Sequence, residues 1–248
     1  TATTSEAEDQ QIIRIVIEQA RGRAKVIAGT GSNSTQSAIQ YTQSARQLGA
    51  DAVLVVAPYY NKPTQAGMLA HFRAVADAAA ELPVILYNVP GRTGCNMTAA
   101  TTLELARDVK NIVAIKEASG DLSQIMQILR NRPPGFRVLS GDDALTFAIM
   151  ALGGEGVVSV ASNEAPAHMS KLCNLCLAGE WNAARELHYK LLPLMEANFI
   201  ESSPGPVKAA LAMMGLCGEH LRLPLVPPMA TTKAKLRGVL NDLGMIKS

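Results

Sequence analysis

A lysine, Lys116, stands at the end of an apolar run in this sequence. The four residues before it, 112–115, are all apolar, as in a strand that is buried on both faces of a parallel sheet. A lysine at the carboxyl end of such a strand points into a partly dry site, where desolvation favours the neutral amine. A neutral lysine amine attacks carbonyl carbon atoms and forms a Schiff base. The alternative is a strand-end lysine whose ammonium group reaches solvent.

A second strand-like run, residues 84–89, carries Tyr87 and leads into a turn that contains Arg92. Tyr87 precedes Lys116 by one strand-helix-strand step, so we expect the two side chains at matching ends of neighbouring strands. A tyrosine hydroxyl beside an amine can transfer protons while a carbinolamine forms and collapses. Arg92 could bind a carboxylate through two parallel hydrogen bonds. The alternatives are a core tyrosine with a satisfied hydroxyl and a solvated loop arginine.

Strand-like and helix-like segments alternate along the first two thirds of the chain. This alternation is typical of strand-helix-strand units that build a parallel sheet. We expect strands at residues 25–28, 52–57, 84–89, 112–115, 137–139 and 156–160, with helices at 35–48, 67–81, 99–109, 123–130 and 144–152. Asn33 with Gln36 is a candidate capping box for the first of these helices. Further helices are expected at 167–177, 182–199, 207–214 and 231–243.

The number of strands indicates an incomplete barrel. Six strand-helix units are two short of a closed eight-fold barrel, and a helix at about residues 6–20 opens the chain with no strand before it. We therefore expect an α/β fold, a (β/α)8 TIM barrel whose first two strands are absent from this chain. The barrel would occupy residues 1–165, and a C-terminal helical region would occupy residues 166–248.

Composition excludes several classes of protein. The net charge is +2, and charged residues make up 18% of the chain, so there is no electrostatic case for nucleic acid or an anionic membrane. No apolar stretch is long enough for a membrane span, and no signal peptide opens the sequence. These features predict a soluble, cytoplasmic protein.

The sequence favours neither a metal site nor a nucleotide cofactor. Cys173 and Cys176 form a C-x-x-C pair in an apolar helical stretch with no second pair, so we expect two core thiols. The four histidines lack metal-ligand spacing. Residues 29–31 read Gly-Thr-Gly, but no third glycine completes a dinucleotide fingerprint. Asp142 and Asp143 are interpreted as turn and helix-cap carboxylates.

Two motifs, whose Tyr87 and Lys116 lie one strand-helix-strand step apart, closely resemble motifs of the pyruvate-lysine family of class I aldolases. They are Tyr-Asn-Val-Pro-Gly-Arg-Thr-Gly at residues 87–94 and Ile-Lys-Glu-Ala-Ser-Gly-Asp at residues 115–121. Further matching stretches are residues 28–33, 57–63, 139–143 and 153–159. The resemblance spans nearly the whole chain. It implies a (β/α)8 barrel followed by helices, assembled as a homotetramer of two tight dimers.

The resemblance also implies a reaction. Lys116 would form a Schiff base with pyruvate, so that no other cofactor is needed. Tyr87 would relay protons, and Arg92 would anchor the carboxylate of the second substrate, aspartate 4-semialdehyde. The product would lead to diaminopimelate and lysine.

Four further residues gain roles only from the resemblance. Tyr60 matches a tyrosine that family members insert across the dimer interface to complete the proton relay. Val158 matches the position whose backbone carbonyl contacts pyruvate. Gly141 and Asp142 would line the same mouth of the barrel.

One departure from the family and two alternatives remain. The family's Gly-Thr-Thr-Gly-Glu loop, whose threonines hold the pyruvate carboxylate, would end immediately before Thr1. A catalytically inactive, truncated scaffold is therefore one alternative. The other is a sister-branch aldolase, an N-acetylneuraminate or sugar-acid lyase, which would keep Lys116 and Tyr87. Arg92 distinguishes this alternative from the condensation with aspartate 4-semialdehyde, because such lyases usually lack an arginine at that position.

Overall fold

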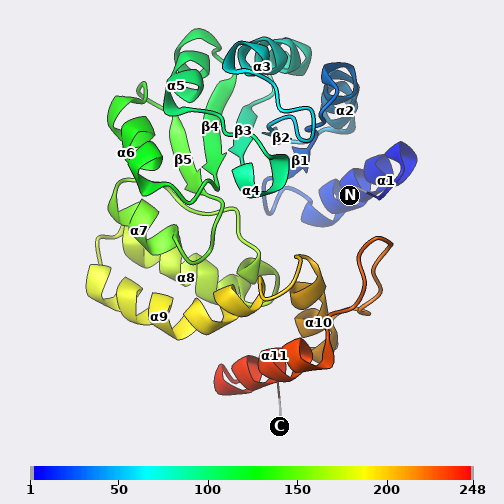
Figure 1. Cartoon of the computed structure of the whole chain (residues 1–248), viewed down its shortest axis with the longest axis vertical. Coiled ribbons are helices and arrows are strands. Elements are labelled where there is room, and N and C mark those ends of the chain that lie inside the picture. The colour runs from blue at the N-terminus through cyan, green and yellow to red at the C-terminus, as the bar shows by residue number, and fades with distance from the viewer. Residues whose placement is uncertain (1–2, 247–248) are drawn as a thin grey trace. The chain divides into compact units, whose positions relative to one another are not determined.

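The chain divides into two compact units, Thr1–Gly141 and Asp142–Ser248, in a computed structural model that describes residues 3–246 (Figure 1). The first unit contains the sheet, and the second is built from helices. The boundary expected near residue 165 separates the barrel from the helices that follow it, whereas the two compact units are divided by contacts within each unit. It therefore stays a prediction.

A five-stranded parallel sheet forms the centre of the first unit. Its strands are β1 (Ile27–Gly29), β2 (Ala52–Val56), β3 (Val84–Asn88), β4 (Ile112–Glu117) and β5 (Arg137–Ser140). They pair in the order of the sequence, β1-β2-β3-β4-β5, and every pair is parallel. A doubly wound sheet would reverse its order at a switch point, whereas a (β/α) barrel adds each strand beside the last. The expected α/β barrel architecture is thus confirmed.

Helices cover one side of this sheet. Figure 1 shows four of them outside the strands: α2 (Thr35–Leu48), α3 (Gln65–Ala79), α5 (Ala99–Asp108) and α6 (Leu122–Asn131). The unit also contains α1 (Glu6–Ala20) and the short α4 (Pro90–Thr93). In α3, Met68, Phe72 and Val75 recur at helical spacing and are fully buried. The helices pack against the sheet through apolar faces of this kind.

Polar residues fix where the helices begin. Ser5 and Glu8 form a capping box before α1, and Asp121 accepts hydrogen bonds from the first turn of α6. The capping box expected at Asn33 is wrong, because Ser34 is the residue that caps α2. The backbone carbonyl of Asn33 instead accepts a 2.8 Å hydrogen bond from the side chain of Asn61.

The second unit packs helices around its own apolar core. They are α7 (Thr146–Ala151), α8 (Pro166–Leu177), α9 (Trp181–Ala197), α10 (Gly205–Met213) and α11 (Ala230–Asp242), with a 3-10 turn at Ala161–Asn163. Leu172, Leu194 and Leu236 are fully buried in this core. No helix within residues 3–246 is both long enough and apolar enough to cross a membrane.

The sixth expected strand, residues 156–160, is wrong. This segment forms only an isolated bridge, at Val157. The side chain of Val157 packs against the core of the helical unit. An apolar run can be buried by helices as well as by neighbouring strands, and that is the outcome here.

Candidate active site

Tyr87 and Lys116 lie side by side at the carboxyl ends of β3 and β4. The strand register aligns them as partners. The Lys116 Nζ atom lies over the face of the Tyr87 ring, 4.1 Å from the ring centroid. The expected neighbourhood of the two side chains is thus confirmed, whereas their chemical roles stay predictions.

Gly141 makes room for the lysine. It follows β5, and a Cβ atom at this position would lie 3.0 Å from Lys116 Cε and 2.6 Å from the Cβ atom of Ala118. Real Cβ atoms are essentially never found closer than 3.0 Å to another heavy atom, so a larger residue would displace the lysine side chain or its strand. The structure therefore places Gly141 directly against Lys116.

The environment of Tyr87 keeps its hydroxyl protonated. Burial raises the pKa of the Tyr87 hydroxyl, and the nearby positive charge of Arg92 opposes this rise only in part. A phenol with a raised pKa stays protonated at neutral pH, so its proton is present to be donated. The side chain can therefore donate a proton to an oxygen that develops beside the lysine.

Arg92 projects from the turn of α4. Its side chain is exposed, while its charge acts on the Tyr87 hydroxyl. The Thr93 hydroxyl donates to the carbonyls of Val89, at 3.2 Å, and Cys95, at 2.8 Å, which fixes the turn. An exposed guanidinium on a fixed turn beside the tyrosine suits the binding of a carboxylate that arrives from solvent.

Tyr60 is the most exposed large hydrophobic residue of this region. Its side chain is 88% exposed, and its backbone φ is +71°, in the left-handed region that bulky residues rarely adopt. Its backbone N–H donates to the carbonyl of Thr93 at 3.3 Å. The residue is thus tied to the α4 turn by its backbone, while its ring faces solvent.

Asp142 and Val158 belong to the helical unit, and both are half-buried. The Asp142 carboxylate accepts a 2.9 Å hydrogen bond from the backbone N–H of Ala144, so the expected turn role is confirmed. Asp143 differs from its expected role as a helix cap. Its buried carboxylate accepts hydrogen bonds from the backbone N–H groups of Val160 and Ala161, at 2.9 and 2.8 Å, and so fixes the chain that follows Val158.

Two buried polar residues that the sequence analysis missed follow the pair. Asn88 comes directly after Tyr87, and Glu117 directly after Lys116; both side chains are fully buried. The Asn88 amide donates to the Glu117 carboxylate at 3.2 Å. The signal in the sequence was the polar residue that follows each candidate catalytic residue in otherwise apolar strands.

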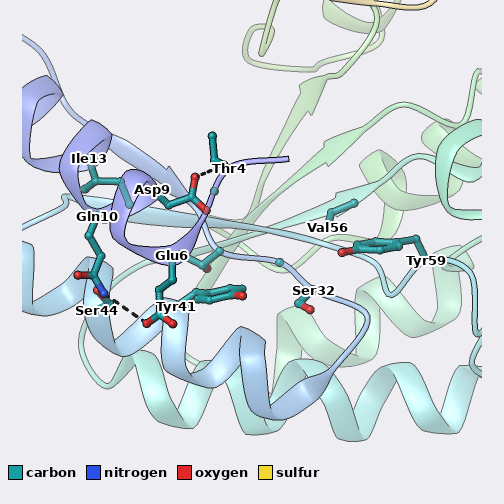
Figure 2. Close-up of a pocket in the computed structure, with 13 residues that line it drawn as sticks. Thr4, Glu6, Asp9, Gln10, Ile13, Ser32, Tyr41, Ser44, Val56 and Tyr59 are labelled. Atoms are coloured by element: carbon teal, nitrogen blue, oxygen red, sulfur yellow. Dashed lines mark hydrogen bonds between the residues drawn. The ribbon is translucent and has the colours of Figure 1, made fainter. Parts of the chain in front are cut away.

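A cavity of about 310 Å³ opens at the ends of β1 and β2, beside α1 (Figure 2). On the α1 side of the cavity, Figure 2 shows a hydrogen bond from Thr4 to Asp9 and another from Gln10 to Glu6. The predicted site residues do not line it. Its lining comprises Thr4, Glu6, Asp9, Gln10, Ile13, Gly29, Thr30, Gly31, Ser32, Tyr41, Ser44, Val56 and Tyr59.

Side chains that bind metals are dispersed. Within residues 3–246, no three histidine, cysteine, aspartate or glutamate side chains are grouped so that they could hold a metal ion. Cys173 is half-buried and Cys176 is buried, both as free thiols. Burial raises the pKa of Cys173 to about 11, and it also raises the pKa of Cys176. These thiols are inert core groups, as expected.

Comparison with known proteins gives matches over nearly the whole chain. A model of the dihydrodipicolinate synthetase family matches residues 1–243. A 4-hydroxy-tetrahydrodipicolinate synthase of Maridesulfovibrio salexigens is 49% identical over 245 residues, which cover 99% of this chain and 84% of that protein.

Solved structures agree with the sequence matches. A chloride-inhibited dihydrodipicolinate synthase of Acinetobacter baumannii, complexed with pyruvate, is 44% identical with a TM-score of 0.96, over 99% of this chain and 84% of that one. A structure described as the first monomeric dihydrodipicolinate synthase variant is 43% identical with a TM-score of 0.97, over 99% and 82% of the two chains.

Proposed function

The chain belongs to the dihydrodipicolinate synthetase family, and we propose that Lys116 carries the Schiff base of its reaction. That reaction condenses pyruvate with aspartate 4-semialdehyde to 4-hydroxy-tetrahydrodipicolinate, in diaminopimelate and lysine biosynthesis. The observation that supports the role of Lys116 is the position of its Nζ atom over the Tyr87 ring, at the carboxyl end of a parallel sheet. Catalytic residues of (β/α) barrels lie at this end of the strands.

In the first half of the reaction, the neutral Lys116 amine attacks the keto carbon of pyruvate, and a carbinolamine forms. Tyr87 donates its hydroxyl proton to the departing oxygen, which leaves as water, and the C=N bond of the imine forms. The tyrosine regains a proton from the nitrogen. Because burial raises the pKa of Tyr87, its resting state is the protonated donor that this step requires.

In the second half, a proton passes from the pyruvate methyl group to the imine nitrogen, and the methyl carbon becomes the nucleophilic carbon of an enamine. This carbon attacks the aldehyde carbon of the semialdehyde, and as the imine re-forms its nitrogen gives up the proton to the aldehyde oxygen. Arg92 holds the carboxylate of the semialdehyde during this step. The substrate amino group then attacks the imine carbon, closes the ring and releases Lys116 as the free amine.

The remaining residues act around this centre. The Val158 carbonyl would contact pyruvate, and Gly141 and Asp142 would line the mouth of the site. Tyr60 would complete the proton relay of a partner subunit in a homotetramer of two dimers; its exposed ring and left-handed backbone support this assignment. The lysine Schiff base replaces any other cofactor. The proposal includes a cytoplasmic location, where this biosynthetic route has its substrates.

A sister-branch aldolase that cleaves N-acetylneuraminate or another sugar acid is the second candidate. It would use the same lysine and tyrosine. The exposed Arg92 beside Tyr87 favours the condensation with the semialdehyde, because a guanidinium matches a carboxylate.

The test of substrate choice is Arg92→Ala. Loss of a charge-assisted contact costs about 1.5–3 kcal/mol, so kcat/KM for the semialdehyde should fall roughly 10- to 150-fold. The KM for pyruvate should change little. Steady-state kinetics with each substrate varied in turn measure both effects.

Arg73→Ala is the matched control, since Arg73 is a partly exposed arginine of α3 that pairs with Glu104 and Asp108. It should leave both KM values unchanged. An equal loss for both substrates in Arg92→Ala would contradict the role of Arg92. Faster turnover of N-acetylneuraminate than of the semialdehyde would assign the protein to the sister branch.

A further inference from the structure

A buried polar network lies directly behind the candidate catalytic pair. In the strand register Tyr87 pairs with Lys116, and one residue later Asn88 pairs with Glu117. The side chains of Asn88 and Glu117 are both fully buried. Since successive side chains of a strand point to opposite faces of the sheet, Glu117 faces away from the side that Lys116 occupies.

Three donors converge on the Glu117 carboxylate. The backbone N–H of Ser119 donates at 2.7 Å, the Gln124 amide at 3.1 Å and the Asn88 amide at 3.2 Å. Asn88 and Glu117 belong to neighbouring strands, and Gln124 belongs to the first turn of α6. The carboxylate therefore joins the ends of β3 and β4 to the helix that follows.

The network continues to the segment before α5. The Asn88 side chain accepts from the backbone N–H of Met97 at 3.0 Å and donates to Asn96 at 2.8 Å. The Asn96 amide in turn donates to the side-chain oxygen of Gln124 at 2.8 Å. Asn88 is thus held from three directions, and its own strand carries Tyr87 one residue earlier.

The pattern of donors indicates that the Glu117 carboxylate is charged. All three partners donate to Glu117, and a protonated carboxyl would instead need an acceptor for its own proton. Burial raises the pKa of Glu117, and the hydrogen bonds from Ser119, Asn88 and Gln124 oppose that rise because they stabilise the charged form. Removing the acceptor would leave buried donors unpaired, at a cost larger than a typical hydrogen bond contributes.

We propose that Glu117 is a positioning residue for the Schiff-base reaction, because it holds β3 and β4 in the register that keeps Tyr87 beside Lys116. The inference rests on the proposed role of Lys116. Glu117 does not touch substrate; it acts through Asn88 and the strand ends. A displacement of about 1 Å between two reacting groups can lower a rate on the order of 100-fold, so a small loss of alignment suffices.

Glu117→Gln is the informative variant. It keeps the size of the side chain but turns one acceptor oxygen into a donor that faces the amides of Asn88 or Gln124. The double variant Asn88→Asp with Glu117→Gln reverses the direction of the bond between the strands, with an acceptor at position 88 and a donor at position 117. The new carboxylate can still accept from the N–H of Met97, and from the side-chain amide of Asn96 once that amide turns, so the bond between the strands is restored.

Thr42→Val is the matched control. The Thr42 hydroxyl is fully buried in the same unit and donates to Thr30 at 2.9 Å, away from the pair. The readouts are the rate of borohydride-trapped pyruvate adduct at saturating pyruvate, the KM for pyruvate and the midpoint of thermal unfolding. These readouts separate alignment of the pair from general stability.

We expect Glu117→Gln to slow adduct formation at least about tenfold, with the KM for pyruvate changed less than about twofold. The double variant should recover to within about threefold of the original rate. Thr42→Val should lower the unfolding midpoint and leave the rate unchanged. If Glu117→Gln does not fold, Gln124→Ala, which removes one donor, should give a smaller slowing in the same direction.

An unchanged rate in folded Glu117→Gln, or in Gln124→Ala if that variant must replace it, would overturn the inference. A folded double variant that stays as slow as Glu117→Gln would also overturn it, since the charge at position 117 and not the alignment would then matter. If the unaltered protein forms no adduct on Lys116, the proposed function fails first, and the two failures are thereby distinguished.

Discussion

The proposed reactivity of Lys116 depends on a few atoms around its amine. The Tyr87 ring lies beneath Nζ, and Gly141 packs against the aliphatic part of the lysine side chain. These contacts hold the amine beside the Tyr87 side chain, which keeps one hydroxyl available for proton transfer. The sequence motifs predicted the tyrosine and the lysine as neighbours. They did not show why a glycine follows β5, because the contact joins residues on different strands.

Gly141→Ala should test this packing. The added Cβ atom would lie too close to Lys116 Cε and Ala118 Cβ, so the lysine must move. We expect a loss of stability of about 1–3 kcal/mol and at least about a tenfold fall in kcat. Denaturant unfolding and initial-rate kinetics measure the two effects. Gly238→Ala is the control, since Gly238 lies in α11 with no heavy atom near the added carbon; it should leave kcat unchanged.

Among the elements, the five strands of the sheet could be predicted from apolar runs, since such runs between helical segments are typical of strands in a parallel sheet. The expected sixth strand is absent because Val157 packs against the core of the helical unit, and Asp143 holds the turn that follows by accepting from the backbone N–H of Val160. The network around Glu117 could not be predicted either. Asn88 and Glu117, at its centre, are separated by one strand-helix step, and a sequence shows polar residues without showing which of them meet.

The turn that follows residues 156–160 contains a buried acid, Glu164. Its side chain is 4% exposed and accepts a 2.8 Å hydrogen bond from the Asn198 amide. Burial, with the nearby charge of Asp143, raises the pKa of Glu164 to about 7, from an ordinary value of 4.5. The folded protein therefore binds this proton more tightly than the unfolded chain.

The free energy of unfolding should consequently fall as the pH rises from about 4.5 to about 7. Above pH 7, Glu164 should cause no further change. The difference is on the order of 3 kcal/mol, at about 1.4 kcal/mol for each pKa unit. Glu164→Gln, which is neutral at every pH, should remove this slope. Denaturant unfolding at pH 5 and pH 8 measures it. Glu186→Gln, at an exposed position of α9, should keep the slope, and a slope that survives in Glu164→Gln would refute the assignment.

For the molecule as a whole, the order of the strands could be predicted, because alternating strands and helices favour sequential parallel pairing. The proposed assembly could not be derived from the elements of one chain. Tyr60 is the residue that supports this proposal, since its ring is 88% exposed on a left-handed backbone and so suits contact with a partner outside the subunit.

Tyr60→Ala should therefore weaken association between subunits. We expect the dissociation constant of the dimer to rise at least about tenfold, as for loss of an aromatic anchor at an interface. Sedimentation velocity over a range of protein concentrations measures it. Tyr189→Ala, at an exposed tyrosine of α9, is the control. Unchanged association in Tyr60→Ala would remove the interface role from this residue.

The most direct test of the account is to find the residue that reacts with pyruvate. The protein is incubated with pyruvate, reduced with borohydride, digested and analysed by mass spectrometry. We predict one reduced adduct, on Lys116, and none in a folded Lys116→Ala variant. An adduct on another lysine, such as Lys62 or Lys208, or an adduct that survives in Lys116→Ala, would contradict the account.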